Sequence, residues 1–148
     1  MEYFEPSSPL FWQTAGYAIV CGAIVGLDRQ LRGKAAGVRT SILICFSTAL
    51  FVRLGASVTE GLVDPTRVLG QVVTGVGFLG AGVMLAKGKT ILGVTTAAVI
   101  WMLAAIGATI GLGYFNAALT VAILTVGILR LVDTLEGAVR SLGPSEPE

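Results

Sequence analysis

The chain has 148 residues, of which 54% are hydrophobic and 13% are charged, and its mean hydropathy is +0.83. Globular domains carry about 25% charged residues, so this composition excludes an ordinary water-soluble domain and predicts a single-domain integral membrane protein. The net charge of +1 excludes the strongly basic surface of a nucleic-acid-binding protein, and the lack of histidine removes the commonest general base and metal ligand.

Five apolar runs follow one another along the chain. We expect helices over residues 10–27, 40–58, 66–86, 94–112 and 115–132, followed by a short polar tail over residues 133–148. The predicted fold is therefore all-α, a polytopic membrane bundle of five transmembrane helices. The segment before the first run is acidic and lacks the positive region of a secretory signal, so we expect this run to be retained.

Small residues mark the first, second and fourth runs. The first and fourth runs each contain a GxxxG pattern, at Gly22–Gly26 and Gly107–Gly111, which predicts close contact with a neighbouring helix. Cys21 and Cys45 lie within apolar helices, so we expect them to act as small packing residues. Trp101 lies well inside the fourth run and not at an interface, so we expect a packing residue and not an aromatic-belt residue.

The third run is the richest in glycine. Its uncharged stretch 71–85 contains four glycines, and a fifth precedes it: Gly75, Gly77, Gly80, Gly82 and Gly70. At about 100° per residue, Gly75 and Gly82 share one helix face, while Gly70 and Gly77 share nearly the opposite one. Because glycine lets helices approach closely in lipid, we expect this helix to be central, with neighbours on both faces. General glycine enrichment of membrane helices is the alternative.

The same stretch contains the hexapeptide GVGFLG, which matches the GxGxxG pattern of dinucleotide-binding proteins. That pattern should follow a strand, open a helix and be followed by an acidic residue about 20 positions later. Here it lies inside an apolar run, and no acidic residue occurs between Asp64 and Asp133. We therefore reject the dinucleotide interpretation.

Basic residues are divided unequally between the two sides of the predicted bundle. With five spans, eight of the ten Lys and Arg residues fall on one side, and two, Arg53 and Arg67, fall on the other. The positive-inside rule then places the amino terminus outside and the carboxyl terminus in the cytoplasm.

One group of polar residues lies at the predicted outer end. Arg53 lies in the outer part of its helix, where its side chain can anchor at the interface or turn inward. The inward alternative predicts an outer polar cluster, which comprises Arg53, Asp64, Arg67 and Gln71. We leave both alternatives open.

A second group lies at the predicted cytoplasmic end. Asp28 follows the first run beside several basic residues, while Thr95 and Thr96 open the fourth helix, where hydroxyls can cap free amides. We expect an inner polar cluster, which comprises Asp28, Arg29, Arg39, Thr95 and Thr96. The alternative is a solvated basic loop held near anionic lipid.

The sequence contains no recognisable catalytic constellation. It has no serine–base pairing, no phosphate loop and no acidic cluster, and no acidic residue occurs in the interior of a predicted span. A magnesium conduit would be expected to use oxygen ligands, so direct magnesium transport is not supported by the residues. We expect no enzyme activity, no metal site and no cofactor.

Three blocks of this sequence resemble the MgtC/SapB family of membrane proteins. In the order in which the family has them, they are GLDRQLRGKAAGVRT (26–40), DPTRVLGQVVTGVGFLGAGVML (64–85) and GVTTAAVIWMLAAIG (93–107). Together they cover about half of the chain. Asp28 stands where the family more often has glutamate, a change that keeps the charge.

The resemblance implies a multi-pass protein of the bacterial inner membrane. It further implies a role in magnesium homeostasis, in virulence and in survival inside host cells, exerted on partner membrane proteins rather than by moving magnesium. The partner that the resemblance implies is F-type ATP synthase. Members of the MgtC type usually carry a soluble carboxyl-terminal domain, which we expect this chain to lack.

Three hypotheses about function follow. The first is a non-enzymatic regulator whose helices bind partner helices, with lipid and other membrane proteins as its partners and no nucleic acid. The second is a small transporter or channel for magnesium or another small solute. The third is a bare scaffold or homo-oligomer.

The predicted orientation can be tested by labelling single cysteines introduced in place of Lys34 and Lys87. We expect both positions to react from the cytoplasmic side, because both lie in loops on the basic side of the predicted spans. A membrane-impermeant maleimide, applied separately to right-side-out and inverted vesicles, measures this. Reaction of the two positions from opposite sides would contradict the topology.

Overall fold

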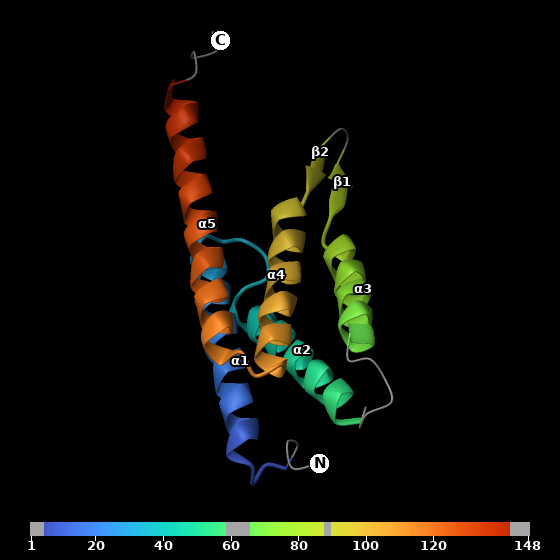
Figure 1. Cartoon of the computed structure of the whole chain (residues 1–148). Coiled ribbons are helices and arrows are strands. Elements are labelled where there is room, and N and C mark those ends of the chain that lie inside the picture. Colours follow the sequence, from blue (N-terminus) through green and yellow to red (C-terminus); the bar gives the residue numbers. More distant parts are fainter. Residues whose placement is uncertain (1–4, 59–65, 88–89, 143–148) are drawn as a thin grey trace.

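Helices make up most of the chain. The structure, a computed structural model, describes residues 5–58, 66–87 and 90–142 (Figure 1). Its elements, in chain order, are α1 (Pro9–Leu31), α2 (Val38–Val58), α3 (Thr66–Gly82), β1 (Leu85–Lys87), β2 (Thr90–Leu92), α4 (Val94–Gly111) and α5 (Phe115–Leu142). The prediction of a helical membrane bundle is confirmed.

Within the residues that the structure describes, four of the five helices are long and apolar enough to cross a membrane, namely α1, α2, α4 and α5. Helix α3 is not among these candidate spans. It has 17 residues and ends at Gly82, whereas the sequence predicted a span continuing to residue 86. At 1.5 Å per residue α3 is about 25 Å long, which is less than the hydrocarbon thickness of about 30 Å. The prediction of five spans therefore exceeds what the helix lengths support.

A short hairpin, which the sequence pattern did not predict, follows α3. Strands β1 and β2 pair antiparallel, with Leu85 opposite Leu92 and Lys87 opposite Thr90. Gly93 then leads into α4 with a φ of +88°, and a Cβ atom there would collide with the carbonyl oxygen of Val83. Only glycine combines this left-handed conformation with so close an approach, so Gly93 fixes how the hairpin joins α4.

Helix α2 is held between α1 and α4 through the glycines of the two GxxxG patterns. A Cβ atom on Gly22 would lie 2.6 Å from Cα of Ile42, and one on Gly26 would lie 2.6 Å from Cα of Val38. On the other side, a Cβ atom on Gly111 would lie 2.8 Å from the carbonyl oxygen of Ala49. The predicted close contacts of the GxxxG patterns are thus confirmed, and α2 is their shared partner.

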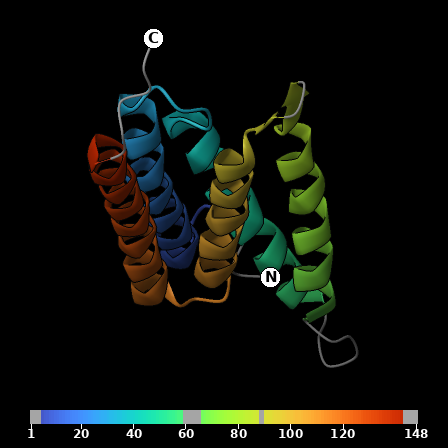
Figure 2. The same cartoon turned by 90° about the horizontal axis from the view of Figure 1, so that it is seen from above.

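Helix α3 lies at the rim of the bundle, so the prediction of a central glycine-rich helix is wrong. In two perpendicular views α3 stands at one edge, away from α1 and α5 (Figures 1 and 2). A Cβ atom on Gly70, Gly75, Gly77 or Gly82 would meet nothing within 4 Å, and only Gly80 faces a neighbour, Ala97, at 3.6 Å. Glycine permits close approach of a helix but does not require one, and here the close approach occurs elsewhere in the bundle.

The interior is apolar and is built from α1, α2, α4 and α5. Fully buried side chains include Cys21, Cys45, Leu103 and Ile106, and the Cys45 thiol donates to the carbonyl oxygen of Leu103 at 3.3 Å. Trp101, predicted to be a packing residue, is 58% exposed. It lies on the face of α4 beside α3, in a groove that the two helices share.

Two helices extend beyond the predicted apolar runs. Helix α1 continues to Leu31 instead of ending at residue 27, and α5 continues to Leu142 instead of ending at residue 132. The polar residues that follow the apolar runs mark the limit of the hydrocarbon-compatible segment, whereas a helix in water or at an interface can continue through them. These extensions build the polar end of the molecule.

Alanine substitution of glycine distinguishes the tight and open helix faces. Gly107→Ala should destabilise the protein by roughly 1–3 kcal/mol, because its Cβ would overlap the carbonyl oxygen of Cys45 and push α4 from α2. Gly75→Ala is the matched control on an open face and should be neutral or stabilising by up to about 1 kcal/mol. Thermal unfolding in detergent measures both, and equal effects of the two variants would contradict this packing.

Candidate functional site: a charged pocket at one end of the bundle

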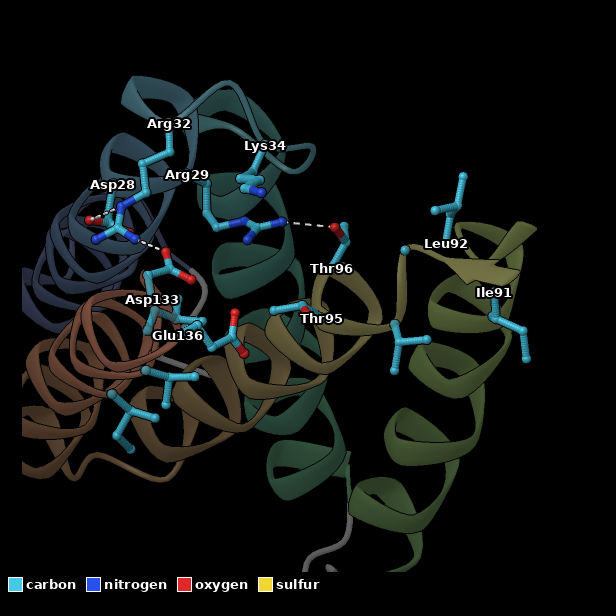
Figure 3. A pocket seen from close by; sticks show the side chains of 15 residues that line it. Asp28, Arg29, Arg32, Lys34, Ile91, Leu92, Thr95, Thr96, Asp133 and Glu136 are labelled. Carbon is cyan, nitrogen blue, oxygen red and sulfur yellow. Dashed lines mark hydrogen bonds and ion pairs between the residues drawn. The ribbon is translucent and has the colours of Figure 1, made fainter. Parts of the chain in front are cut away.

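A pocket of about 550 Å³ opens where α1 ends and α4 begins. Its walls come from the end of α1 and the turn after it, strand β2, the start of α4 and the second half of α5 (Figure 3). We call it the end pocket. The residues that carry charge or a hydroxyl in its lining are Asp28, Arg29, Arg32, Lys34, Thr95, Thr96, Asp133 and Glu136.

Asp28 links α1 to α5 from a buried position. It is 3% exposed, and its Oδ1 accepts a hydrogen bond of 2.8 Å from Nε of Arg130. The same oxygen lies 3.3 Å from Nε of Arg32, one turn further along α1. Oδ2 is also buried, and among the described residues it has no hydrogen-bond partner. One carboxylate oxygen of Asp28 thus has partners and the other has none in the described structure, which is costly for a buried carboxylate.

Arg29 links α1 to α4. It is 4% exposed, and its Nη2 donates to Oγ1 of Thr96 at 2.8 Å, while Nε donates to the carbonyl oxygen of Ala35 at 3.2 Å. The second bond exists because the chain doubles back after α1, with positive φ at Gly33 and Ala36. The turn after α1 and the length of α1 therefore hold the buried Arg29 guanidinium against the start of α4.

The opposite wall of the end pocket is acidic and comes from α5. Arg32 bonds to Asp133, which joins this wall to the end of α1, and Glu136 lies one turn further on (Figure 3). In the described part of the chain, Glu136 makes no ion pair. The pocket therefore presents positive groups from α1 and the following turn, and negative groups from α5.

The start of α4 contributes backbone amides. Gly93 is the residue before the first turn, and no side chain that the structure describes caps this helix end. We expected the hydroxyls of Thr95 and Thr96 to cap it, but Thr96 instead accepts a hydrogen bond from Arg29 and Thr95 is exposed in the pocket lining. Free first-turn amides carry partial positive charge and favour anions.

The structure brings together four of the five residues of the inner polar cluster. Asp28, Arg29, Thr95 and Thr96 line the end pocket, whereas Arg39 is exposed and does not line it. The predicted cluster did not include four other charged residues that line the pocket, Arg32, Lys34, Asp133 and Glu136, or Arg130, which bonds to Asp28 from α5. The spacing of Asp133 and Glu136, three residues apart, would have placed them on one face had the last helix been extended.

The outer polar cluster stays a prediction. Asp64 lies outside the described residues. Arg53 is partly buried on α2, while Arg67 and Gln71 are exposed on α3. Gln71 lines a groove between α2 and α3 together with Ser47 and Thr48.

Chemically, the end pocket is an arrangement of fixed charges. Ion pairs and hydrogen bonds hold Asp28, Arg29 and Arg32 in place, so these groups are preorganised to meet a charged ligand. Charges of both signs lie in one cavity, with apolar side chains such as Leu92 and Ile128 beside them. This combination suits binding and orientation of a polar group at the edge of a membrane.

Comparison with known proteins gives consistent matches. The MgtC family model matches residues 16–138. The chain is 44% identical over 125 residues to YhiD of Escherichia coli (strain K12), named as a candidate magnesium transporter, covering 80% of this chain and 58% of YhiD. It is 42% identical over 114 residues to MgtC of Salmonella typhimurium (strain LT2), covering 76% of this chain and 48% of that protein.

A third relative extends the match. The chain is 39% identical over 134 residues to MgtC of Brucella abortus (strain 2308), covering 88% of this chain and 56% of the relative. The chain thus spans about half the length of the curated relatives it matches. No solved structure matches it.

A double-mutant cycle on Asp28 and Arg130 tests the link between α1 and α5. We expect Asp28→Asn to destabilise the protein by roughly 1–3 kcal/mol, because it removes a buried charged acceptor. Arg130→Gln should cost less, about 1 kcal/mol or below, because the Arg130 side chain is 62% exposed. The coupling between the two should be at least about 0.5 kcal/mol. Thermal unfolding of the four proteins measures it, and strictly additive effects would contradict the link.

Proposed function

Since the chain belongs to the MgtC family, we propose that it serves magnesium homeostasis by binding other membrane proteins, as a non-enzymatic regulator. The chain is a membrane protein with several apolar helices. We place it in the bacterial inner membrane, with its amino terminus outside and its carboxyl terminus in the cytoplasm. This topology takes the short helix α3, together with the hairpin after it, as a fifth crossing beside the four candidate spans. The name of YhiD supports the link to magnesium.

The observation that carries this proposal is an open stripe of small residues on α3. Gly70, Thr74, Gly77 and Ala81 follow one another at spacings of four, three and four, so they share one helix face. All four are exposed, and a Cβ atom on either glycine would meet nothing within 4 Å. The Thr74 hydroxyl already donates to the carbonyl oxygen of Gly70 at 2.9 Å. We call this face the outer stripe.

The outer stripe fits a transmembrane helix of another protein. Within this chain, every tight glycine of the GxxxG patterns is filled by the backbone or side chain of a neighbouring helix, as Gly22 is by Ile42. The outer stripe repeats the same small-residue spacing but has no helix against it in the described structure. Phe78, which is 77% exposed beside the stripe, adds a large apolar contact. A partner helix would gain close packing there without displacing any part of the bundle.

The partner that we propose is F-type ATP synthase, and restraint of this enzyme is the proposed route to magnesium homeostasis and to survival inside host cells. A second copy of the chain is the competing occupant of the outer stripe. Both are membrane proteins with apolar helices, so the test must separate them.

A transporter is the second candidate function, favoured by the name of YhiD and by the charged end pocket. Between that pocket and the opposite end, however, the interior is closely packed and apolar. Leu103, Ile106 and Ile110 are fully buried, and a Cβ atom on Gly107 would overlap Cys45. A solute would need the bundle to open at the tight α2–α4 contact.

A bulky residue in the outer stripe should block the proposed partner. We expect tagged wild-type protein to recover ATP synthase from native membranes and to lower its ATP synthesis, and Gly77→Leu to recover roughly tenfold less, because its side chain holds the helices apart. Gly127→Leu on α5 is the matched control, since Gly127 is also exposed with nothing within 4 Å.

Two results would contradict this proposal. One is equal recovery of ATP synthase by the Gly77→Leu and Gly127→Leu proteins. The other is magnesium flux into proteoliposomes containing only the purified chain, which would favour the transporter. Cross-linking of purified protein in liposomes, if abolished by Gly77→Leu, would assign the outer stripe to a second copy.

A further inference from the structure

We propose that the end pocket binds a phosphoethanolamine group, that is, a phosphodiester joined to a primary ammonium, supplied by the headgroup of phosphatidylethanolamine. This proposal concerns a site away from the outer stripe and does not depend on the function proposed for α3.

The phosphate side of the pocket is defined by Arg29. Its guanidinium is buried, yet its hydrogen bonds go to two uncharged oxygens, those of Ala35 and Thr96. Among the described carboxylates none forms an ion pair with it. Asp28 and Asp133 act on this guanidinium electrostatically, but at distances beyond an ion pair. A ligand that brings an anion into direct contact with the buried cation therefore gains from it. Lys34 and the uncapped start of α4 line the same cavity and add positive potential.

The ammonium side is defined by the carboxylates. Glu136 of α5 lines the pocket and makes no ion pair with a described residue. Asp28 also lines it, and its buried Oδ2 accepts no hydrogen bond from any group that the structure describes. An ammonium has three donors for such acceptors. A simple phosphate would leave Glu136 without an ion pair, and a metal cation would bring no negative charge to Arg29, whereas a zwitterion serves both residues.

The position and lining of the pocket point to a lipid as the source. Helix α1 ends at Leu31 and α4 begins at Val94, so the pocket lies at the end of the spans, at headgroup depth in either orientation. Ile91 and Leu92 on β2 are 63% and 50% exposed at its edge. A volume of about 550 Å³ admits a headgroup, while the apolar edge faces the acyl chains.

Lipid binding by the purified full chain, followed by native mass spectrometry, tests the proposal. The probes are phosphatidylethanolamine and phosphatidylglycerol of identical acyl chains. Lys34→Gln should weaken binding of both lipids by roughly tenfold, because both carry the phosphate. Glu136→Gln should weaken binding of phosphatidylethanolamine by roughly tenfold, because this lipid carries the ammonium. Binding of phosphatidylglycerol, which has no ammonium, should be unchanged or stronger. Arg39 is an exposed cation outside the pocket lining, so Arg39→Gln should change the binding of neither lipid.

Competition with water-soluble compounds then distinguishes the ligand chemistry. Glycerophosphoethanolamine should displace the retained lipid, whereas inorganic phosphate at the same concentration should displace much less. Three outcomes would overturn the proposal: equal loss of both lipids in Glu136→Gln, a Lys34→Gln protein that behaves like Arg39→Gln, or inorganic phosphate displacing lipid as well as glycerophosphoethanolamine does. All the substituted residues are exposed, so the variants should fold, and thermal unfolding checks that they do.

Discussion

The close approach of α1 and α4 to α2 determines the rest of this structure. Gly22 and Gly26 on one side, and Gly107 and Gly111 on the other, leave no room for a side chain against the α2 backbone. In lipid there is little hydrophobic gain from bringing helices together, so close packing of this kind is a main source of helix association. Once α2 is held on both sides, α5 and α3 can only pack outside this three-helix unit, and they do so at different places.

The two ends of the bundle consequently differ in character. Where α1 ends and α4 begins, the second half of α5 passes alongside and brings Arg130 and Asp133 to Asp28 and Arg32. Arg29 meanwhile reaches Thr96 on α4. These contacts tie together helices that are far apart in the chain, and they also leave charged atoms facing a cavity. The same residues thus stabilise the end of the bundle and provide its binding chemistry.

Part of this arrangement was predictable from the sequence. Apolar runs identified the helices, and the GxxxG patterns identified Gly22 and Gly107 as contact points, because their spacing leaves one helix face without side chains. The same reasoning failed for Gly75 and Gly77, because a bare face shows where a helix can approach and not whether one does. Whether a glycine face is packed or open depends on which helices become neighbours in the folded bundle, and the sequence of one helix does not determine that.

The end pocket was predicted in part for a related reason. Asp28, Arg29 and Thr96 were grouped because they stand at the ends of adjacent spans, and they share one cavity in the structure. Asp133 and Glu136 were missed because loss of hydropathy was equated with the end of the helix, whereas α5 continues to Leu142. The hydropathy of a sequence indicates which segment lies in the hydrocarbon, whereas its helix propensity indicates where the helix ends. The two boundaries therefore have to be predicted separately.

The position of α3 at the rim, with α2 enclosed between α1 and α4, is the claim on which the proposed partner surface depends. Oxygen accessibility of a nitroxide label at Phe78, in purified protein reconstituted in liposomes with Cys21 and Cys45 replaced by alanine, measures it most directly. We predict lipid-phase oxygen collision as high as at Ile123, which is 56% exposed on α5. Shielding at Phe78 as strong as at the buried Ile106 would contradict the account.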